Sequence, residues 1–214
     1  MWFVRHGEAE HNPGVKQGKA ENNMEMLSAA RGILDPKLTE KGKEQASALR
    51  AKCQEEGLKF DLLVTTPLSR AMQTAHLALA DFVSGECIIT PECTETSHSE
   101  HSFDSAGRPL GNAQKGSSIA DMKATHAFLS EDAKWTFEYV KEGDNWVLDG
   151  DGWVHPVPIE QRLAQFKDWL LSLSSEKQVV VVGHSGVFDK LVGLDMGNCE
   201  IVRVEAEDLP TLAS

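Results

Sequence analysis

Short apolar segments recur along the chain, and each of them ends in polar or charged residues. The four clearest are residues 1–4, 60–66, 86–90 and 178–182. Stretches with helical periodicity lie between them, so strands and helices alternate in the sequence. This alternation predicts an α/β fold with three layers, in which helices flank a mostly parallel central sheet.

The predicted helices are defined by their capping residues and apolar faces. Before the second strand, Thr39 is the expected N-cap and Gly57 the expected stop. Ala46, Leu49 and Cys53 share one face between them, at helical spacing. Further helices are predicted at residues 67–82, with Pro67 at the first position, and at residues 158–175, and a last strand at residues 200–206.

Two regions show less regular patterns. Residues 6–36 are polar, rich in Asn, Gly and Glu, and without strong periodicity, so we predict a long loop of the kind that often carries function. Residues 92–157 contain one recognisable helix at about 117–129, which Ser118 would cap, and a turn-like "DGDGW".

Length and composition suit one domain spanning residues 1–214, since 41% of the residues are apolar. The four cysteines are scattered without CxxC spacing, so we expect reduced thiols in a cytoplasmic protein. The first residues lack a basic start followed by a long apolar run, and the longest apolar run, residues 179–182, is too short for a bilayer. Neither a secretory signal nor a membrane partner is therefore expected.

The formal net charge of -12 narrows the class of partner. Nucleic-acid phosphates select clustered Lys and Arg, so an acidic chain is not expected to bind nucleic acid. A few arginines in a cleft can still make a local positive site for a small anionic substrate.

Polar side chains follow the predicted strands at the points where ligands bind in parallel sheets, beyond the carboxyl ends. Arg5 and His6 follow the first strand, and His184 follows the segment at 178–182. Arg70 lies one helical turn after the second strand, and Glu95 lies just beyond the third. If these strands are parallel, all five side chains meet at one edge of the sheet.

This combination of residue types suits phosphoryl transfer. Two guanidinium groups can bind a phosphoryl group through planar pairs of donors. One histidine can attack phosphorus and leave again, and a second can donate to a phosphoryl oxygen. A glutamic acid can protonate a leaving alkoxide and later deprotonate water. The chemistry requires neither a metal nor a cofactor, so none is expected.

Three motifs occur in order along the chain: "RHGEAEHN" near the N-terminus, "TTPLSRAMQTA" about sixty residues later and "VVGHSG" near the C-terminus. They resemble the signatures of the histidine phosphatase superfamily, which is also called phosphoglycerate mutase-like, and "LTEKGKEQASAL" resembles the helix between the first two. The resemblance covers about residues 1–95 and 159–206. It implies a phosphoglycerate mutase-like fold in which residues of about 92–157 form a variable, substrate-facing insertion.

The resemblance also implies a role for each matched residue in the phosphoryl-binding motifs. His6 would be the nucleophile that becomes phosphorylated. Arg5, Arg70 and His184 would bind the phosphoryl oxygens and stabilise their charge. The implied substrate-binding residues are Asn12, Gly7, Ser185 and His98.

The position of the acid and base is less sharply defined by the sequence. "TPECTE" resembles the family's proline followed, after two or three residues, by glutamate, which points to Glu95. Glu92 is the competing choice, because Glu-Cys-Thr stands where the family usually has leucine-like residues.

Other interpretations of the histidines and of the glycine-rich motif are weaker. His11, His76, His126 and His155 are expected to be surface or satisfied core residues. A zinc site built from His98, Glu100 and His101 lacks further ligands at a suitable spacing. "GHSG" lacks the last glycine of the GxSxG nucleophile elbow, because Val187 follows it.

The sequence therefore predicts a metal-independent phosphatase of the histidine acid phosphatase type, which hydrolyses a phosphomonoester through a phosphohistidine on His6. Its expected substrate is a small phosphorylated molecule, and a phosphopeptide is also compatible. A phosphoglycerate mutase-type phosphotransferase is the alternative, although the region after the acid carries Arg108 without an arginine pair or an "ERHYG"-like stretch. A non-catalytic phosphate-binding module is the second alternative, but such a module would be expected to have lost His6, Arg70 or His184.

Overall fold

The computed structural model describes residues 1–95, 116–137, 147–149, 152–154, 159–173 and 177–209. Within these residues, the central sheet has six strands in the order β4-β3-β2-β7-β1-β8. The strands are β1 (Trp2–Arg5), β2 (Leu62–Thr65), β3 (Cys87–Ile89), β4 (Trp135–Phe137), β7 (Val179–Gly183) and β8 (Ile201–Arg203). Only β8 runs antiparallel to its neighbour among these described strands, so the predicted mostly parallel α/β fold is confirmed.

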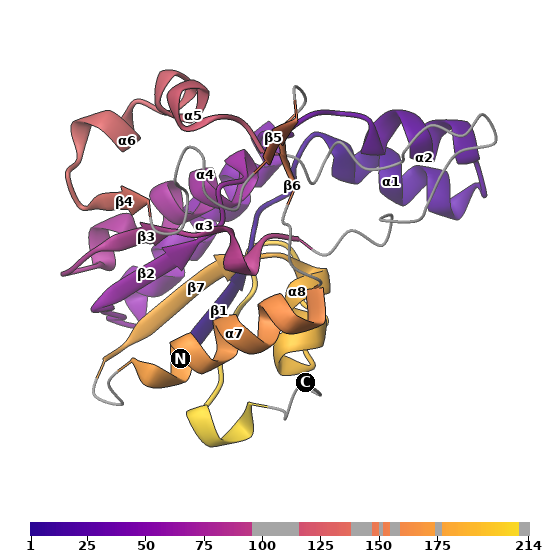
Figure 1. Ribbon diagram of the computed structural model, residues 1–214. Helices are drawn as coiled ribbons and strands as arrows, with labels where there is room; N and C mark the ends of the chain where they lie inside the picture. Colours follow the sequence, from indigo (N-terminus) through magenta and orange to yellow (C-terminus); the bar gives the residue numbers. More distant parts are fainter. Residues whose placement is uncertain (96–115, 138–146, 150–151, 155–158, 174–176, 210–214) are drawn as a thin grey trace.

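Helices cover both faces of this sheet (Figure 1). The helices are α3 (Glu40–Glu55) and α4 (Ser69–Ala78) on one face, and α7 (Ile159–Ser172) and α8 (Ser185–Val192) on the other. Successive strand side chains point to opposite faces, so Val180 and Val182 pack with α3 and α4, whereas Val179 and Val181 pack with α7 and α8. Burial on both faces of the sheet explains why β7, which carries these valines, is apolar throughout.

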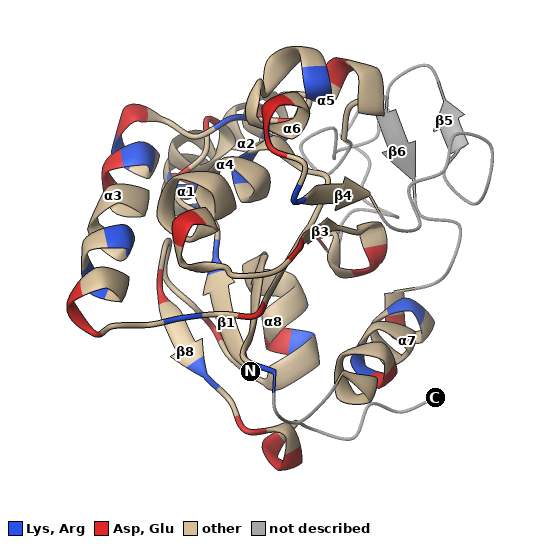
Figure 2. Cartoon of the chain, turned by 90° about the vertical axis from the view of Figure 1, so that its left-hand side faces the viewer, with Lys and Arg blue, Asp and Glu red and all other residues tan. Residues whose placement is uncertain are grey.

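The capping residue predicted for the helix before the second strand is confirmed. The Thr39 hydroxyl accepts a hydrogen bond from the backbone N–H of Gly42 at 3.0 Å, and α3 begins at the next residue, Glu40. Figure 2 shows acidic and basic residues interspersed along α3, as expected for a helix whose outer side faces solvent. None of the helices in the described ranges has both the length and the apolar character needed to cross a membrane.

The prediction of a long loop at residues 6–36 is wrong, because this region contains α1 (His11–Ala20) and α2 (Met24–Arg31). The two helices pack closely at two glycines: a Cβ added at Gly14 would lie 2.8 Å from the Cβ of Ala30, and one added at Gly18 would lie 2.8 Å from the Cγ of Leu27. Figure 1 shows the pair extending from the end of the sheet at which β1 stops. Glycines inside polar helices weaken the helical signal, although here they allow close packing.

The helix after β2 begins two residues later than predicted, at Ser69 rather than Pro67. Its N-cap residue, Leu68, has no capping side chain, and the carboxylate of Asp35 accepts the Ser69 N–H instead, at 2.8 Å. Asp35 is buried and also accepts hydrogen bonds from the hydroxyls of Ser69 and Ser117. The residues before α3 therefore help to fix the start of α4, which carries Arg70.

Most of the remaining helices and strands in the described ranges lie in the irregular middle of the chain. Ser118 caps α5 (Ile119–Thr125) as predicted, although that helix ends before residue 129 and α6 (Phe128–Glu131) follows it. Strand β4 then joins the edge of the central sheet beside β3. The other elements in the described ranges are the antiparallel pair β5 (Val147–Asp149) and β6 (Gly152–Val154), and the 3-10 turns η1 (Ala80–Phe82), η2 (Pro91–Cys93) and η4 (Ala206–Asp208).

Candidate active site

The carboxyl ends of β1 and β7 bring the two predicted catalytic histidines together. Arg5 is paired with Gly183 in the parallel ladder, and the backbone N–H of His6 donates to the carbonyl of Gly183 at 3.0 Å. His184 follows directly, so the centroids of the His6 and His184 rings lie 5.1 Å apart. Both rings are buried, with exposed fractions of 2% for His6 and 0% for His184.

One tautomer of His6 is fixed by a backbone carbonyl. The Nδ1 atom lies 2.7 Å from the carbonyl oxygen of Gly7, which can only accept, so Nδ1 carries the proton and Nε2 has the lone pair. Burial, and then the charge of Arg70, hold the pKa of His6 well below its usual value of 6.5. The imidazole is therefore neutral at neutral pH and suited to attack an electrophile through Nε2.

His184 is held from one side and is open to a further hydrogen bond on the other. Its Nε2 lies 3.0 Å from the hydroxyl oxygen of Thr66, the residue after β2. Its Nδ1 is buried and has no hydrogen-bond partner among the described residues. Burial, then the charges of Arg70 and His6, lower the pKa of His184 well below the usual value. Buried polar atoms are normally paired, so this nitrogen is suited to contact a ligand.

Two arginines contribute positive charge to the same edge of the sheet. Arg5 donates from Nη1 to the carbonyl of Met196 at 2.6 Å, and Arg70 is 99% buried, with an exposed fraction of 1%. Burial lowers the pKa of Arg70 to about 10, against the opposing effects of Glu95 and Asp35. Because this pKa stays well above neutral pH, the Arg70 guanidinium is charged there and can bind an anion.

The two candidate acids differ in the charged groups that surround them. Glu95 is the carboxylate with the largest effect on the pKa of Arg70, ahead of Asp35. Glu92 lies in η2, where it and Arg162 of α7 both influence the pKa of the Cys93 thiol. The Arg162 guanidinium also donates to the carbonyl of Pro91 at 3.1 Å. The charge relation to the arginine site therefore favours Glu95 over Glu92.

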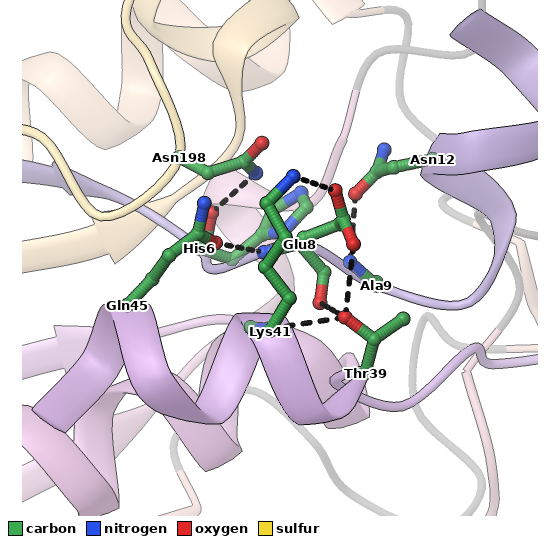
Figure 3. A network of polar contacts seen from close by, with 9 residues as sticks. His6, Glu8, Ala9, Asn12, Thr39, Lys41, Gln45 and Asn198 are labelled. Carbon is green, nitrogen blue, oxygen red and sulfur yellow. Dashed lines mark hydrogen bonds and ion pairs between the residues drawn. The ribbon is translucent and has the colours of Figure 1, made fainter.

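The loop that follows His6 is fixed to α3 by polar contacts (Figure 3). Glu8 accepts from the Thr39 hydroxyl at 3.1 Å and from the Lys41 ammonium at 2.8 Å, while its backbone N–H donates to Gln45 at 2.8 Å. The amide of Asn198 donates to the backbone carbonyl of His6 at 2.8 Å. The contacts of Glu8 with α3 and the contact of Asn198 with His6 therefore fix the position of this histidine.

Close backbone packing adds to this fixation of the loop. A Cβ at Gly42 would overlap the carbonyl oxygen of Glu8, and a Cβ at Gly7 would lie 2.7 Å from the carbonyl oxygen of Gly42. The Gly7 N–H donates to the hydroxyl of Thr74, a buried residue of α4, at 3.0 Å, so α4 also holds the loop. Glycine is needed at both positions because the two backbones approach each other directly.

The other predicted substrate-binding residues have different environments. The Asn12 side chain accepts from the Ala9 N–H at 2.8 Å, and its amide nitrogen lies 3.1 Å from Nε2 of His11. Ser185 is the first residue of α8, and its hydroxyl donates to Asp195 at 3.1 Å. His98 lies outside the described residues, as do Glu100, His101, Arg108 and His155. Within the described part of the chain, no group of three or more His, Cys, Asp or Glu side chains could hold a metal ion.

The structure places His11 close to His6, and the expectation for His126 is confirmed. The His11 ring centroid lies 6.3 Å from that of His6, and the charges of Arg70 and Arg5 act on its pKa. His126 is a satisfied core residue, buried with its Nε2 2.9 Å from the hydroxyl of Ser69. The sequence signal for His11 was its position one residue before Asn12 in "RHGEAEHN". The prediction of a loop at residues 6–36 missed α1, the helix that positions His11.

The buried histidines predict that the protein loses stability in acid. Since the pKa values of His6 and His184 are lowered in the folded state, the unfolded chain binds more protons below its usual histidine pKa of 6.5. Their contribution is absent above this pH, and it destabilises the fold by about 1.4 kcal/mol per pH unit for each histidine as the pH falls below it. Urea unfolding at pH 7.5, 6.0 and 5.0 measures this slope. His184→Gln should show a shallower slope than the wild type, and equal slopes would contradict the assignment.

Comparison with known proteins identifies related sequences. The family model described as "Histidine phosphatase superfamily (branch 1)" matches residues 1–102. Over 88 residues the chain is 38% identical to the 2,3-bisphosphoglycerate-dependent phosphoglycerate mutase of Bartonella henselae, a match that covers 40% of this chain and 42% of that mutase. It is 26% identical over 206 residues to the adenosylcobalamin/alpha-ribazole phosphatase of Escherichia coli, which covers 92% of this chain and 79% of that phosphatase.

A solved structure shares the fold over most of the chain. A mycobacterial glucosyl-3-phosphoglycerate phosphatase, in complex with VO3, aligns with a TM-score of 0.52 and 22% sequence identity, covering 94% of this chain and 88% of that one. This similarity confirms the phosphoglycerate mutase-like fold that the motifs implied. The related proteins include both phosphatases and mutases.

Proposed function

We propose that this protein is a phosphatase of the histidine phosphatase superfamily, whose family model matches residues 1–102, and that it hydrolyses a phosphomonoester through a phosphohistidine on His6. One observation carries the proposal: the buried His6 ring, whose Nε2 has the lone pair, lies 5.1 Å from the ring of His184, and the charges of Arg70 and Arg5 act on it. His184 adds a buried nitrogen without a partner among the described residues. A tetrahedral dianion would bind to this group of cations and donors.

In the first step, Nε2 of His6 attacks phosphorus while the bond from phosphorus to the leaving oxygen breaks. Arg5, Arg70 and His184 bind the phosphoryl oxygens, so their charge is balanced as the group moves. Glu95 gives its proton to the leaving alkoxide, and the product alcohol departs. The phosphorus is then bonded to His6, and Glu95 is a carboxylate.

In the second step, Glu95 takes a proton from water as the water oxygen attacks the phosphohistidine. The phosphorus–nitrogen bond breaks, its electron pair returns to Nε2, and inorganic phosphate is released. Neutral His6 and protonated Glu95 are restored, so the cycle balances without a metal or a redox partner.

The extent of the matches favours a phosphatase over a mutase. The similarity to the mutase has the higher identity, 38% against 26%, but it covers only 40% of this chain. The similarity to the alpha-ribazole phosphatase covers 92%. The two reactions differ in the acceptor, which is water for a phosphatase and a second hydroxyl for a mutase. With a phosphoglycerate as substrate, we therefore expect release of inorganic phosphate and no phosphoglycerate isomer.

An assay of p-nitrophenyl phosphate and a panel of small phosphorylated metabolites tests this function. We expect release of inorganic phosphate at an unchanged rate after dialysis against a chelator, because protein groups supply all the positive charge in the proposed steps. Loss of activity that a divalent metal restores would contradict the mechanism. Binding of phosphate without turnover of any substrate would favour a non-catalytic binding module.

A further inference from the structure

His11 takes no part in the steps above, yet it lies at the same edge of the sheet. It is the first residue of α1, and its ring is 6.3 Å from that of His6 and inclined to it by 42°. The charges of Arg70 and Arg5 act on His11, and the charge of His11 would in turn act on His6 and His184. This side chain is therefore coupled electrostatically to all four residues of the proposed phosphoryl site.

A short chain of hydrogen bonds determines which nitrogen of His11 carries the proton. The backbone N–H of Ala9 can only donate, so the atom of Asn12 that lies 2.8 Å from it is the side-chain oxygen. The amide nitrogen of Asn12 consequently faces Nε2 of His11, at 3.1 Å, and donates to it. Since Nε2 accepts a hydrogen bond, the proton of the neutral ring is on Nδ1.

The protonated nitrogen of His11 is a hydrogen-bond donor that no acceptor of the described residues satisfies. Nδ1 of His11 is buried and has no hydrogen-bond partner among the described residues. Nδ1 of His184 shares this property at the same site. Buried donors without acceptors are costly and uncommon, so a site that holds one is suited to a ligand with acceptor oxygens.

We propose that His11 is a third histidine of the phosphoryl site, which donates from Nδ1 to an oxygen of the bound phosphoryl group. The inference rests on the proposed phosphatase function and adds a contact to it. Burial and the nearby Arg70 and Arg5 lower the pKa of His11 to about 3, so the ring acts as a neutral donor rather than as an acid. Asn12 is then a positioning residue, because it fixes the tautomer of His11.

Inhibition by orthovanadate and by inorganic phosphate tests the contact, using the full chain with p-nitrophenyl phosphate as substrate. His11→Phe keeps a planar ring and removes the donor, and should weaken both inhibitors on the order of 10- to 100-fold, as for one hydrogen bond to a charged group. His11→Asn places an amide nitrogen near the position of Nδ1, and should retain the wild-type affinity to within about threefold. His11→Gln places its amide near Nε2 instead, and should resemble His11→Phe.

The pattern across these variants separates the inference from the function on which it depends. If the wild type neither binds the two anions nor hydrolyses the ester, the phosphatase proposal itself fails. If the wild type does both and His11→Phe binds the anions equally well, the function stands and the His11 contact is wrong. If His11→Asn and His11→Gln lose affinity equally, His11 has a packing role and the contact is likewise refuted. Nitrogen-15 NMR of the free wild-type protein should show the proton of His11 on Nδ1, and the opposite tautomer would overturn the inference.

Discussion

Replacement of His6 by alanine is expected to abolish phosphatase turnover while the fold persists. Without Nε2 at the carboxyl end of β1, no phosphorus–nitrogen bond can form, and the rate should fall by at least about three orders of magnitude. The backbone of residue 6 keeps its hydrogen bonds to Gly183 and Asn198, so the loop should retain its position. The rate with p-nitrophenyl phosphate and the thermal unfolding curve measure the two effects separately.

His76→Ala is a suitable control for this experiment. His76 is a histidine of α4 that stacks on Phe128, with ring centroids 4.0 Å apart, and has no part in the proposed site. This variant should keep its activity even if its stability falls. Trapping with a phosphorus-32 labelled substrate should give an acid-labile protein adduct in the wild type and none in His6→Ala. Substantial hydrolysis by a folded His6→Ala protein would refute the phosphohistidine mechanism.

Replacement of Glu95 by glutamine is expected to have the second-largest effect, and one that depends on the leaving group. An alkyl phosphate needs a proton on its leaving oxygen, so kcat should fall by about 10²- to 10⁴-fold. p-Nitrophenolate leaves without a proton, so formation of the phosphohistidine from the aryl ester should be much less affected. Comparison of burst and steady-state rates for the two substrates separates this step from the later attack of water.

Glu92→Gln is the matched control, because it makes the same chemical change three residues earlier. Glu92 lies in η2 beside Cys93, whereas Glu95 has the larger charge effect on Arg70. We expect Glu92→Gln to keep the activity with both substrates. A leaving-group-dependent loss in Glu92→Gln in place of Glu95→Gln would assign the acid to Glu92. Loss in neither variant would remove glutamate from the mechanism.

The sequence predicted a mostly parallel sheet and the polar residues at its strand ends because these features depend on local patterns. The apolar run at Val179–Val182 required a strand buried on both faces, and parallel pairing then placed Arg5, His6 and His184 at one edge. Such features need only short stretches of sequence to specify them.

Features that depend on contacts between distant residues were not predicted. The helices α1 and α2 bury little apolar surface, and Gly14 and Gly18 are favourable only because Ala30 and Leu27 pack against them. The start of α4 depends on Asp35, which lies 34 residues before Ser69 in the chain. His11 was missed for the same reason, since its position follows from the helix that the loop prediction omitted.

The strand order has a consequence for the synthesis of the protein. Strand β1, which carries Arg5 and leads to His6, lies between β7 and β8 and pairs with both. Its partners come much later in the chain, at residues 179–183 and 201–203, so β1 must wait for them to be synthesised. Pairing over such sequence distances slows folding, so a nascent chain that stops before β7 holds the proposed nucleophile, His6, without the strands that position it. The proposed phosphatase activity would therefore require β7 and β8 to be paired with β1.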